Sequence, residues 1–139
     1  MSVSVVVDTN VFTAGLRMDR ALEAQYAKHV VGRRVAVAPQ TVAEARYGAL
    51  SASWGSRRRG ELDHAIARAR LLPVDGELID TVVSVRNECR MKGHALHQGN
   101  HNADLWIAAA AIRWSLPLVA HDAVLIGCPG LDLRTELVA

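Results

Sequence analysis

Four acidic side chains stand next to the ends of apolar segments rather than on solvated faces. Asp8 directly follows the apolar run Val3–Val7, and Asp122 directly follows another apolar run near the end of the chain. Glu44 and Asp104 lie in the first turns of two expected helices. Carboxylates crowded into a partly buried site repel one another unless protons or a cation neutralise them. Such a set of oxygen donors without thiolates suits Mg²⁺ or Mn²⁺, with water kept for chemistry.

Each of these acids also has a purely structural interpretation. Asp8 could form an Asx turn or cap the next helix. Glu44 could complete a capping box with Thr41, Asp104 could complement a helix dipole, and Asp122 could be a turn residue. Because caps and turns attract the same residue types, no single acid decides between the two interpretations. The four together favour a shared site.

The elements that would position these acids alternate between strands and helices. Val3–Val7 and Val35–Ala38 are short apolar runs typical of strands in a parallel sheet, and Leu116–Ala120 is a third. A short edge strand is expected at 132–134. In an open parallel sheet the ligand site lies off the carboxyl ends of the strands, which is where three of the four acids fall.

Helices are expected between the strands from the spacing of apolar residues and from turn residues. They cover about 22–31, 39–50, 57–72, 76–92 and 102–115. Gly93 ends the fourth helix in a left-handed conformation. The last helix is apolar almost all round, which predicts a buried helix whose Trp106 and Trp114 belong to the core. The alternation predicts an α/β fold with a doubly covered, mainly parallel sheet.

Length and composition limit the classes of protein. A chain of 139 residues fits one domain over 1–139, and 50% apolar with 22% charged residues is a globular composition. A net charge of +2 means that polyanion binding has to be local. Cys89 and Cys128 form no CxxC pair, which fits a reducing cytoplasm. The apolar run before Asp8 is too short for a signal peptide, and none approaches the ~20 residues of a membrane span. We therefore expect a soluble cytoplasmic protein.

Four segments together resemble the motifs of PIN-domain nucleases. They are Val5-Val6-Val7-Asp8-Thr9-Asn10, Ala43-Glu44-Ala45-Arg46-Tyr47-Gly48, Asn102-Ala103-Asp104-Leu105-Trp106-Ile107-Ala108-Ala109 and Leu118-Val119-Ala120-His121-Asp122. Their order and spacing are most similar to the VapC-type toxins of bacterial toxin–antitoxin pairs, and the match covers essentially the whole chain. The resemblance implies a three-layer α/β/α sandwich and a Mg²⁺- or Mn²⁺-dependent endoribonuclease. It also implies a homodimer, a VapB-type antitoxin partner and an RNA substrate.

The resemblance also implies roles for individual residues. The catalytic metal ligands would be Asp8, Glu44, Asp104 and Asp122. Thr9 and Asn10 would support them from outside. The implied chemistry is hydrolysis of an RNA phosphodiester by metal-activated water, which needs no nucleophilic side chain. The family often has Ser or Thr two residues before its last Asp, whereas this chain has Ala120.

A tryptophan and three arginines are candidates for RNA contact. Trp54 precedes Arg57, Arg58 and Arg59 in a Ser/Gly-rich loop. They could stack a base and hold phosphates, or they could be a solvated helix start. We favour RNA contact, and contact with a second copy or with an antitoxin stays open as an alternative.

Three histidines have a spacing that invites a zinc interpretation. His94, His97 and His101 lie three and four residues apart, but no cysteine is near. The segment leads into the helix that carries Asp104. We therefore expect these histidines to line the substrate cleft.

Other functions fit the sequence less well. Aspartyl phosphatases and receiver domains also place Asp at strand ends, but here Asn10 stands at the second Asp position and no Lys follows Lys92. Two alternatives stay open. The chain could be a PIN-like nuclease of RNA processing outside a toxin–antitoxin pair, or a non-catalytic module whose acids hold an ion or a basic partner segment.

Overall fold

A parallel five-stranded sheet forms the centre of the computed structural model, which describes residues 3–138. The strands are β1 (Ser4–Val7), β2 (Arg34–Val37), β3 (Arg70–Leu71), β4 (Leu118–Val119) and β5 (Leu133–Arg134). Their order is β3-β2-β1-β4-β5, and each pairs in parallel with its neighbours. The central strand β1 thus lies between β2 and β4, and all carboxyl ends meet at one edge.

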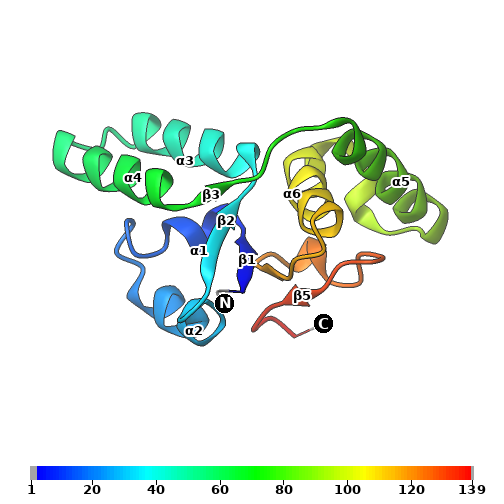
Figure 1. Ribbon diagram of the computed structural model, residues 1–139. Helices are drawn as coiled ribbons and strands as arrows, with labels where there is room; N and C mark the ends of the chain where they lie inside the picture. Colours follow the sequence, from blue (N-terminus) through cyan, green and yellow to red (C-terminus); the bar gives the residue numbers. More distant parts are fainter. Residues whose placement is uncertain (1–2, 139) are drawn as a thin grey trace.

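Helices cover both faces of this sheet (Figure 1). They are α1 (Thr9–Thr13), α2 (Arg20–Val30), α3 (Pro39–Ser51), α4 (Ser56–Arg68), α5 (Gly76–Lys92) and α6 (Asn102–Arg113), with 3₁₀ turns η1 (Ala95–His97), η2 (Gly99–His101) and η3 (Ala123–Leu125). Figure 1 shows α3 and α4 as an antiparallel pair that extends away from α5 and α6. In residues 3–138, no helix combines the length and the apolar character needed to cross a membrane.

Alternating side chains of β1 separate two parts of the core. Val5 and Val7 pack with Tyr26 and the other apolar residues of α1 and α2. Val6 points to the opposite face and packs in the larger cluster with α5 and α6. A strand buried on both faces needs such a continuous apolar run. The predicted three-layer α/β/α class is confirmed.

The helix α6 is the buried helix that the sequence predicts. Leu105 and the run 107–111 are buried, and Trp106 and Trp114 pack against the same core. Gly93 ends α5 with φ of 70°, as expected for the left-handed position after a helix. These two predictions succeed because each depends on a strong local pattern.

Two short elements differ from the sequence prediction. The helix expected up to Pro73 ends at Arg68, and β3 follows it by pairing with β2. The helix α1 begins directly after Asp8, where the sequence predicts an Asx turn or the cap of a later helix. A two-residue strand and a five-residue helix are too short to produce a periodic pattern, so the sheet neighbour and the cap determine them.

Candidate active site

The carboxyl ends of β1 and β4 lie side by side because Val7 pairs with Val119. Asp8 follows β1, and its side chain is only 4% exposed. Its Oδ1 accepts a hydrogen bond from the backbone N of Val11 at 2.9 Å, which caps α1. Its Oδ2 accepts one from the backbone N of His121 at 3.1 Å. Asp8 therefore acts as a helix cap and also links the ends of two strands.

The four acids lie close enough together that the charge of one affects the pKa of another. Burial raises the pKa of Asp8 from 3.8 to about 6, although two backbone N–H groups oppose this and the charge of Asp122 adds to it. Burial is also the main reason that the pKa of Asp104 rises to about 7. The charges of Asp122, Glu44 and Asp8 contribute further to that rise. Each charge makes it harder to ionise the next carboxyl.

Glu44 reaches this edge from α3. Its Oε1 accepts a hydrogen bond from the Thr9 hydroxyl at 2.7 Å, so Thr9 orients this acid. The capping box with Thr41 is wrong, because α3 has its N-cap at Ala38 and Pro39 occupies the first turn. Thr41 lies inside that turn, fully buried, and its hydroxyl has no hydrogen-bond partner among the described residues.

Asp122 and Asp104 come from the other side of the cluster. Asp122 Oδ1 accepts a hydrogen bond from Val124 N at 3.1 Å and so caps η3. Asp104 lies in the first turn of α6, with Oδ2 3.9 Å from Nδ1 of His101. A carboxylate has about four lone-pair sites, so a capping bond leaves capacity for a cation.

The chemistry of this donor set fits a hard divalent cation. All four groups are carboxylates, which Mg²⁺ and Mn²⁺ prefer. Within residues 3–138 none of them forms an ion pair with Lys or Arg; the basic groups near them are His101, beside Asp104, and His121, beside Asp8. In the same part of the chain no group of three or more His, Cys, Asp or Glu side chains lies close enough together to hold a metal ion as it stands. The fit to a divalent cation therefore rests on the chemistry of the four carboxylates and not on a formed coordination geometry.

His121 and Tyr26 organise this edge, and the sequence analysis did not single them out. The Nδ1 atom of His121 lies 2.8 Å from the Tyr26 hydroxyl, and the two rings meet edge to face. The backbone O of His121 accepts a hydrogen bond from Asn10 Nδ2 at 3.4 Å, which places the predicted supporting residue Asn10 beside this turn. Tyr26 fits the apolar spacing of its helix and His121 stands in the segment that ends in Asp122, but only the fold reveals the contact between them.

The histidines before α6 are divided between two roles. His94 Nε2 contacts the carbonyl of Ile126 at 2.8 Å, and its Nδ1 accepts a hydrogen bond from Leu96 N. His97 Nδ1 contacts the carbonyl of His94. The expectation that they line the cleft is therefore wrong for His94 and His97, which fasten the segment before α6. His101 alone of the three faces an acid of the cluster.

The arginines of α4 differ from one another more than the sequence suggests. Arg58 stacks on Trp54 at 4.0 Å and donates a hydrogen bond to the carbonyl of Leu16 at 2.6 Å. These contacts give Arg58 and Trp54 a structural role. Arg57 is 92% exposed and lies 3.5 Å from Glu61. Arg59 is exposed as well and lines a shallow hollow between α3 and α4.

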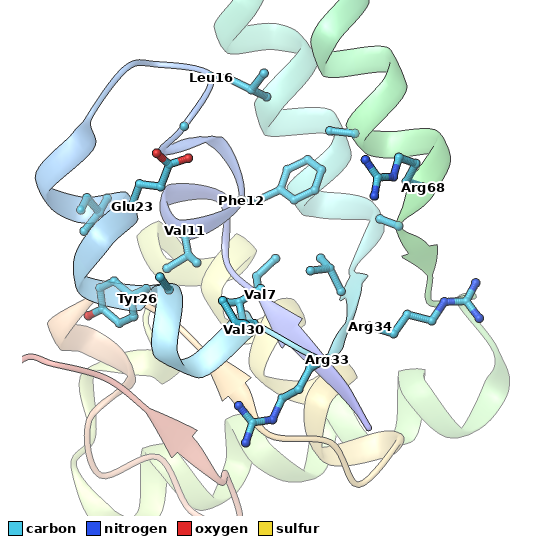
Figure 2. A pocket seen from close by; sticks show the side chains of 17 residues that line it. Val7, Val11, Phe12, Leu16, Glu23, Tyr26, Val30, Arg33, Arg34 and Arg68 are labelled. Carbon is cyan, nitrogen blue, oxygen red and sulfur yellow. The ribbon is translucent and has the colours of Figure 1, made fainter. Parts of the chain in front are cut away.

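An apolar groove of about 690 Å³ opens between the helices on one side of the sheet (Figure 2). Val7, Val11 and Tyr26 belong to its lining, which comes from β1, β2, α1, α2 and α4. Three exposed arginines stand around it in Figure 2: Arg33, Arg34 and Arg68. None of the four acids lines this groove, although Val7, which does, directly precedes Asp8 in the chain.

Comparisons with known proteins agree with this architecture. The family model described as PIN domain matches residues 5–126. The chain therefore belongs to the PIN-domain family. Ribonuclease VapC5 of Mycobacterium tuberculosis is 33% identical over 124 residues, which cover 84% of this chain and 82% of that protein. This similarity places the chain among the VapC proteins, and the family resemblance of the sequence is confirmed.

Solved structures show the same fold. The VapBC-5 toxin–antitoxin structure from M. tuberculosis contains a chain with TM-score 0.65 and 29% identity, covering 97% of this chain and 98% of that one. The structure of VapBC2 from Rickettsia felis, bound to a DNA fragment from its promoter, has TM-score 0.77. It is 20% identical and covers 95% of this chain and 98% of that one. At that identity the likeness concerns the fold.

Proposed function

We propose that this protein is a divalent-metal-dependent endoribonuclease and the toxin of a toxin–antitoxin pair. The observation that carries the proposal is the cluster of Asp8, Glu44, Asp104 and Asp122 at one sheet edge, with the pKa values of two of them raised by burial and by their neighbours. Membership of the VapC proteins supports the reaction and the role. Mg²⁺ or Mn²⁺ is the cofactor that the carboxylate donors fit.

The four acids would hold the metal and act as the catalytic residues. When bound, the ion supplies a Lewis acid and activates water for in-line attack on the RNA phosphorus. Asp8 presents a carboxylate that two backbone N–H groups hold in place. Thr9 orients Glu44 through a hydrogen bond, and Asp104 completes the set from α6. No side chain has to act as a nucleophile, because the attacking group comes from water.

We propose that a VapB-type antitoxin occupies the apolar groove. Toxin–antitoxin complexes are the solved relatives of this fold, which supports such a partner. The groove would suit an amphipathic helix whose apolar face covers Val11 and Phe12 and whose acidic flank meets Arg34 and Arg68. A basic side chain of the same partner would be attracted to the carboxylates for the reason that a cation is. Occupying both regions would block RNA access.

Self-association is the second interaction that we propose. Tyr47 and Leu50 on α3 and Val83 on α5 are large apolar side chains that remain exposed in the single chain. Burying such side chains in a homodimer removes apolar area from water. The molar mass from light scattering tests this, and Leu50→Lys should shift a dimer toward monomer. A monomeric wild-type protein at high concentration contradicts it.

A cleavage assay tests the proposed enzyme. Purified protein is incubated with total cellular RNA, with and without chelator, and the cleavage sites are mapped. We expect cleavage that the chelator stops and excess Mn²⁺ restores, and no cleavage by Asp104→Asn. RNA binding without cleavage would favour the non-catalytic module. Cleavage that the chelator leaves unchanged would contradict the metal site. Inhibition of this cleavage by an antitoxin encoded beside the gene would distinguish a toxin from a processing nuclease.

A further inference from the structure

The turn after β4 carries Asp122 and contacts Asp8, but it lies beyond the backbone hydrogen bonds that join β4 to β5. The last backbone bond of this strand joins Ala120 N to Arg134 O at 3.2 Å. His121 and Asp122 lie beyond it, in neither a strand nor a helix. Ala120 is buried and has no hydroxyl with which to fasten the turn. Metal-binding side chains must stay within about 0.5 Å of their working positions, so another contact has to fix this segment.

His121 fixes this segment through three groups: its backbone N, its backbone O and its ring Nδ1. Its backbone N donates to Asp8 Oδ2 at 3.1 Å, and its backbone O accepts from Asn10 at 3.4 Å. Its side chain points the other way, with Nδ1 2.8 Å from the Tyr26 hydroxyl. Fixing the ring therefore fixes the backbone N–H that holds Asp8.

Tyr26 is a rigid anchor for this ring. It is 1% exposed, and its ring meets the His121 ring at 77° with centroids 5.5 Å apart. Its hydroxyl accepts a hydrogen bond from Glu136 N at 3.1 Å and lies 3.2 Å from Thr135 Oγ1. Thr135 Oγ1 in turn accepts from Leu137 N. If Thr135 donates to Tyr26, the phenol proton is available for His121 Nδ1, and every group is satisfied.

We propose that Tyr26 and His121 are positioning residues for the metal site: the Tyr26 hydroxyl fixes the His121 ring, and the His121 backbone fixes the Asp8 carboxylate. The inference rests on the proposed function. Neither residue touches RNA or the ion, and each acts through Asp8. In this chain Ala120 has no hydroxyl with which to fasten the turn, and the pair of Tyr26 and His121 supplies that support instead.

The test measures Mn²⁺ affinity of the full chain by calorimetry, beside cleavage kinetics. Tyr26→Phe removes one hydroxyl and keeps the ring. We expect about tenfold weaker Mn²⁺ binding, the size typical for residues that orient metal ligands. The kcat should fall with KM for RNA unchanged. Thr135→Val is the matched control, because it removes one of the two contacts of the Tyr26 hydroxyl with the C-terminal segment, keeps the hydrogen bond from Glu136 N and leaves His121 in place. It should lower Tm without changing Mn²⁺ affinity.

A double-mutant cycle identifies the path through His121. His121→Ala keeps the backbone N–H but removes the ring, and it should weaken Mn²⁺ binding as much as Tyr26→Phe does. The double variant should lose no more than either single one, because both remove the same contact. His121→Asn keeps a polar atom near the Nδ1 position and should recover most of the affinity.

Three outcomes would overturn the proposal or its basis. Unchanged Mn²⁺ affinity in Tyr26→Phe would show that the hydroxyl does not position Asp8. An equal loss in Thr135→Val would mean that anchoring of the C-terminal segment is the cause. A wild-type protein that does not bind Mn²⁺ would overturn the proposed metal site itself, and the positioning role with it.

Discussion

The carboxylate cluster and the apolar groove both include residues at the end of β1, but they are built in opposite ways. Val7 lines the groove, and Asp8, the next residue, belongs to the cluster. The cluster concentrates negative charge that raises pKa values, whereas the groove is apolar with arginines around it. One region is complementary to a cation and the other to an apolar, acidic segment. Tyr26 belongs to both, because its ring lines the groove and its hydroxyl contacts His121.

This contrast separates chemistry from recognition. Changes in the cluster should affect metal binding, cleavage and the pH dependence of stability. Changes in the groove should affect the partner first. A variant that alters both regions equally would show that they form one functional unit.

The largest expected effect is the loss of cleavage in Asp8→Asn. The amide can still cap α1, since Asn is a good N-cap residue, but it cannot replace an anionic metal ligand. A metal site contributes several kcal/mol to transition-state stabilisation, so cleavage should fall roughly a thousandfold or more. The measurement is the initial cleavage rate at saturating RNA, with circular dichroism as the control for folding. Full activity of Asp8→Asn would exclude the cluster as the catalytic site.

Stability without metal should fall as pH rises. The pKa of Asp8 is raised to about 6 in the folded protein, so between about pH 4 and 6 the folded chain keeps a proton that the unfolded chain has lost. Unfolding then releases protons, and its free energy decreases with rising pH. For Asp8 the loss is about 3 kcal/mol at most.

Urea unfolding with chelator present, at about pH 5 and pH 8, measures this change. Asp104 contributes in the same direction, because its pKa is also raised. Asp8→Asn is the matched control and should be less pH-dependent, because it cannot ionise. A protein that is more stable at pH 8 would contradict the buried-charge explanation.

The sequence predicts the cluster and not the groove for a physical reason. Asp8 and Asp122 are recognisable because both stand just after apolar strand-like runs, and parallel strands bring the ends of such runs together. The groove has no local pattern, since its lining comes from segments far apart in the chain. The contact between Tyr26 and His121 spans 95 positions and is equally invisible in the sequence. The fold class was predictable because β1 and α6 are continuously apolar.

Mn²⁺ should stabilise the protein, and more strongly at about pH 8 than at pH 5. The acids must lose their protons to bind the ion, so binding weakens below the raised pKa values of Asp8 and Asp104. At a concentration 100 times Kd, binding adds about 2.7 kcal/mol to the free energy of unfolding. Differential scanning fluorimetry measures the rise in Tm, which should vanish in Asp104→Asn. An equal rise in that variant would locate the ion elsewhere.

Charge reversal beside the groove should weaken the partner more than the chemistry. Arg34→Glu combined with Arg68→Glu inverts two exposed charges that lie outside the carboxylate cluster. We expect about tenfold weaker antitoxin binding, mainly through slower association that depends on salt. Surface plasmon resonance measures both rates. Replacing these residues by Gln is the control for lost packing. If cleavage falls as much as antitoxin affinity, the groove also serves the RNA.

The smallest effect should separate two adjacent arginines of α4. Arg58 joins α4 to Leu16, a residue of the groove lining, and also covers Trp54. Arg58→Ala should cost about 1–2 kcal/mol of unfolding free energy, because it removes a hydrogen bond and a cation–π contact. Arg57→Ala should cost less than about 0.5 kcal/mol, since Arg57 is 92% exposed and its pair with Glu61 is a surface ion pair.

If RNA passes this side of the molecule, Arg57→Ala lowers the salt slope of RNA binding by about one. Urea unfolding and RNA titrations at several salt concentrations measure both. An unchanged salt slope would show that Arg57 is a solvated residue that makes no contact with an RNA phosphate.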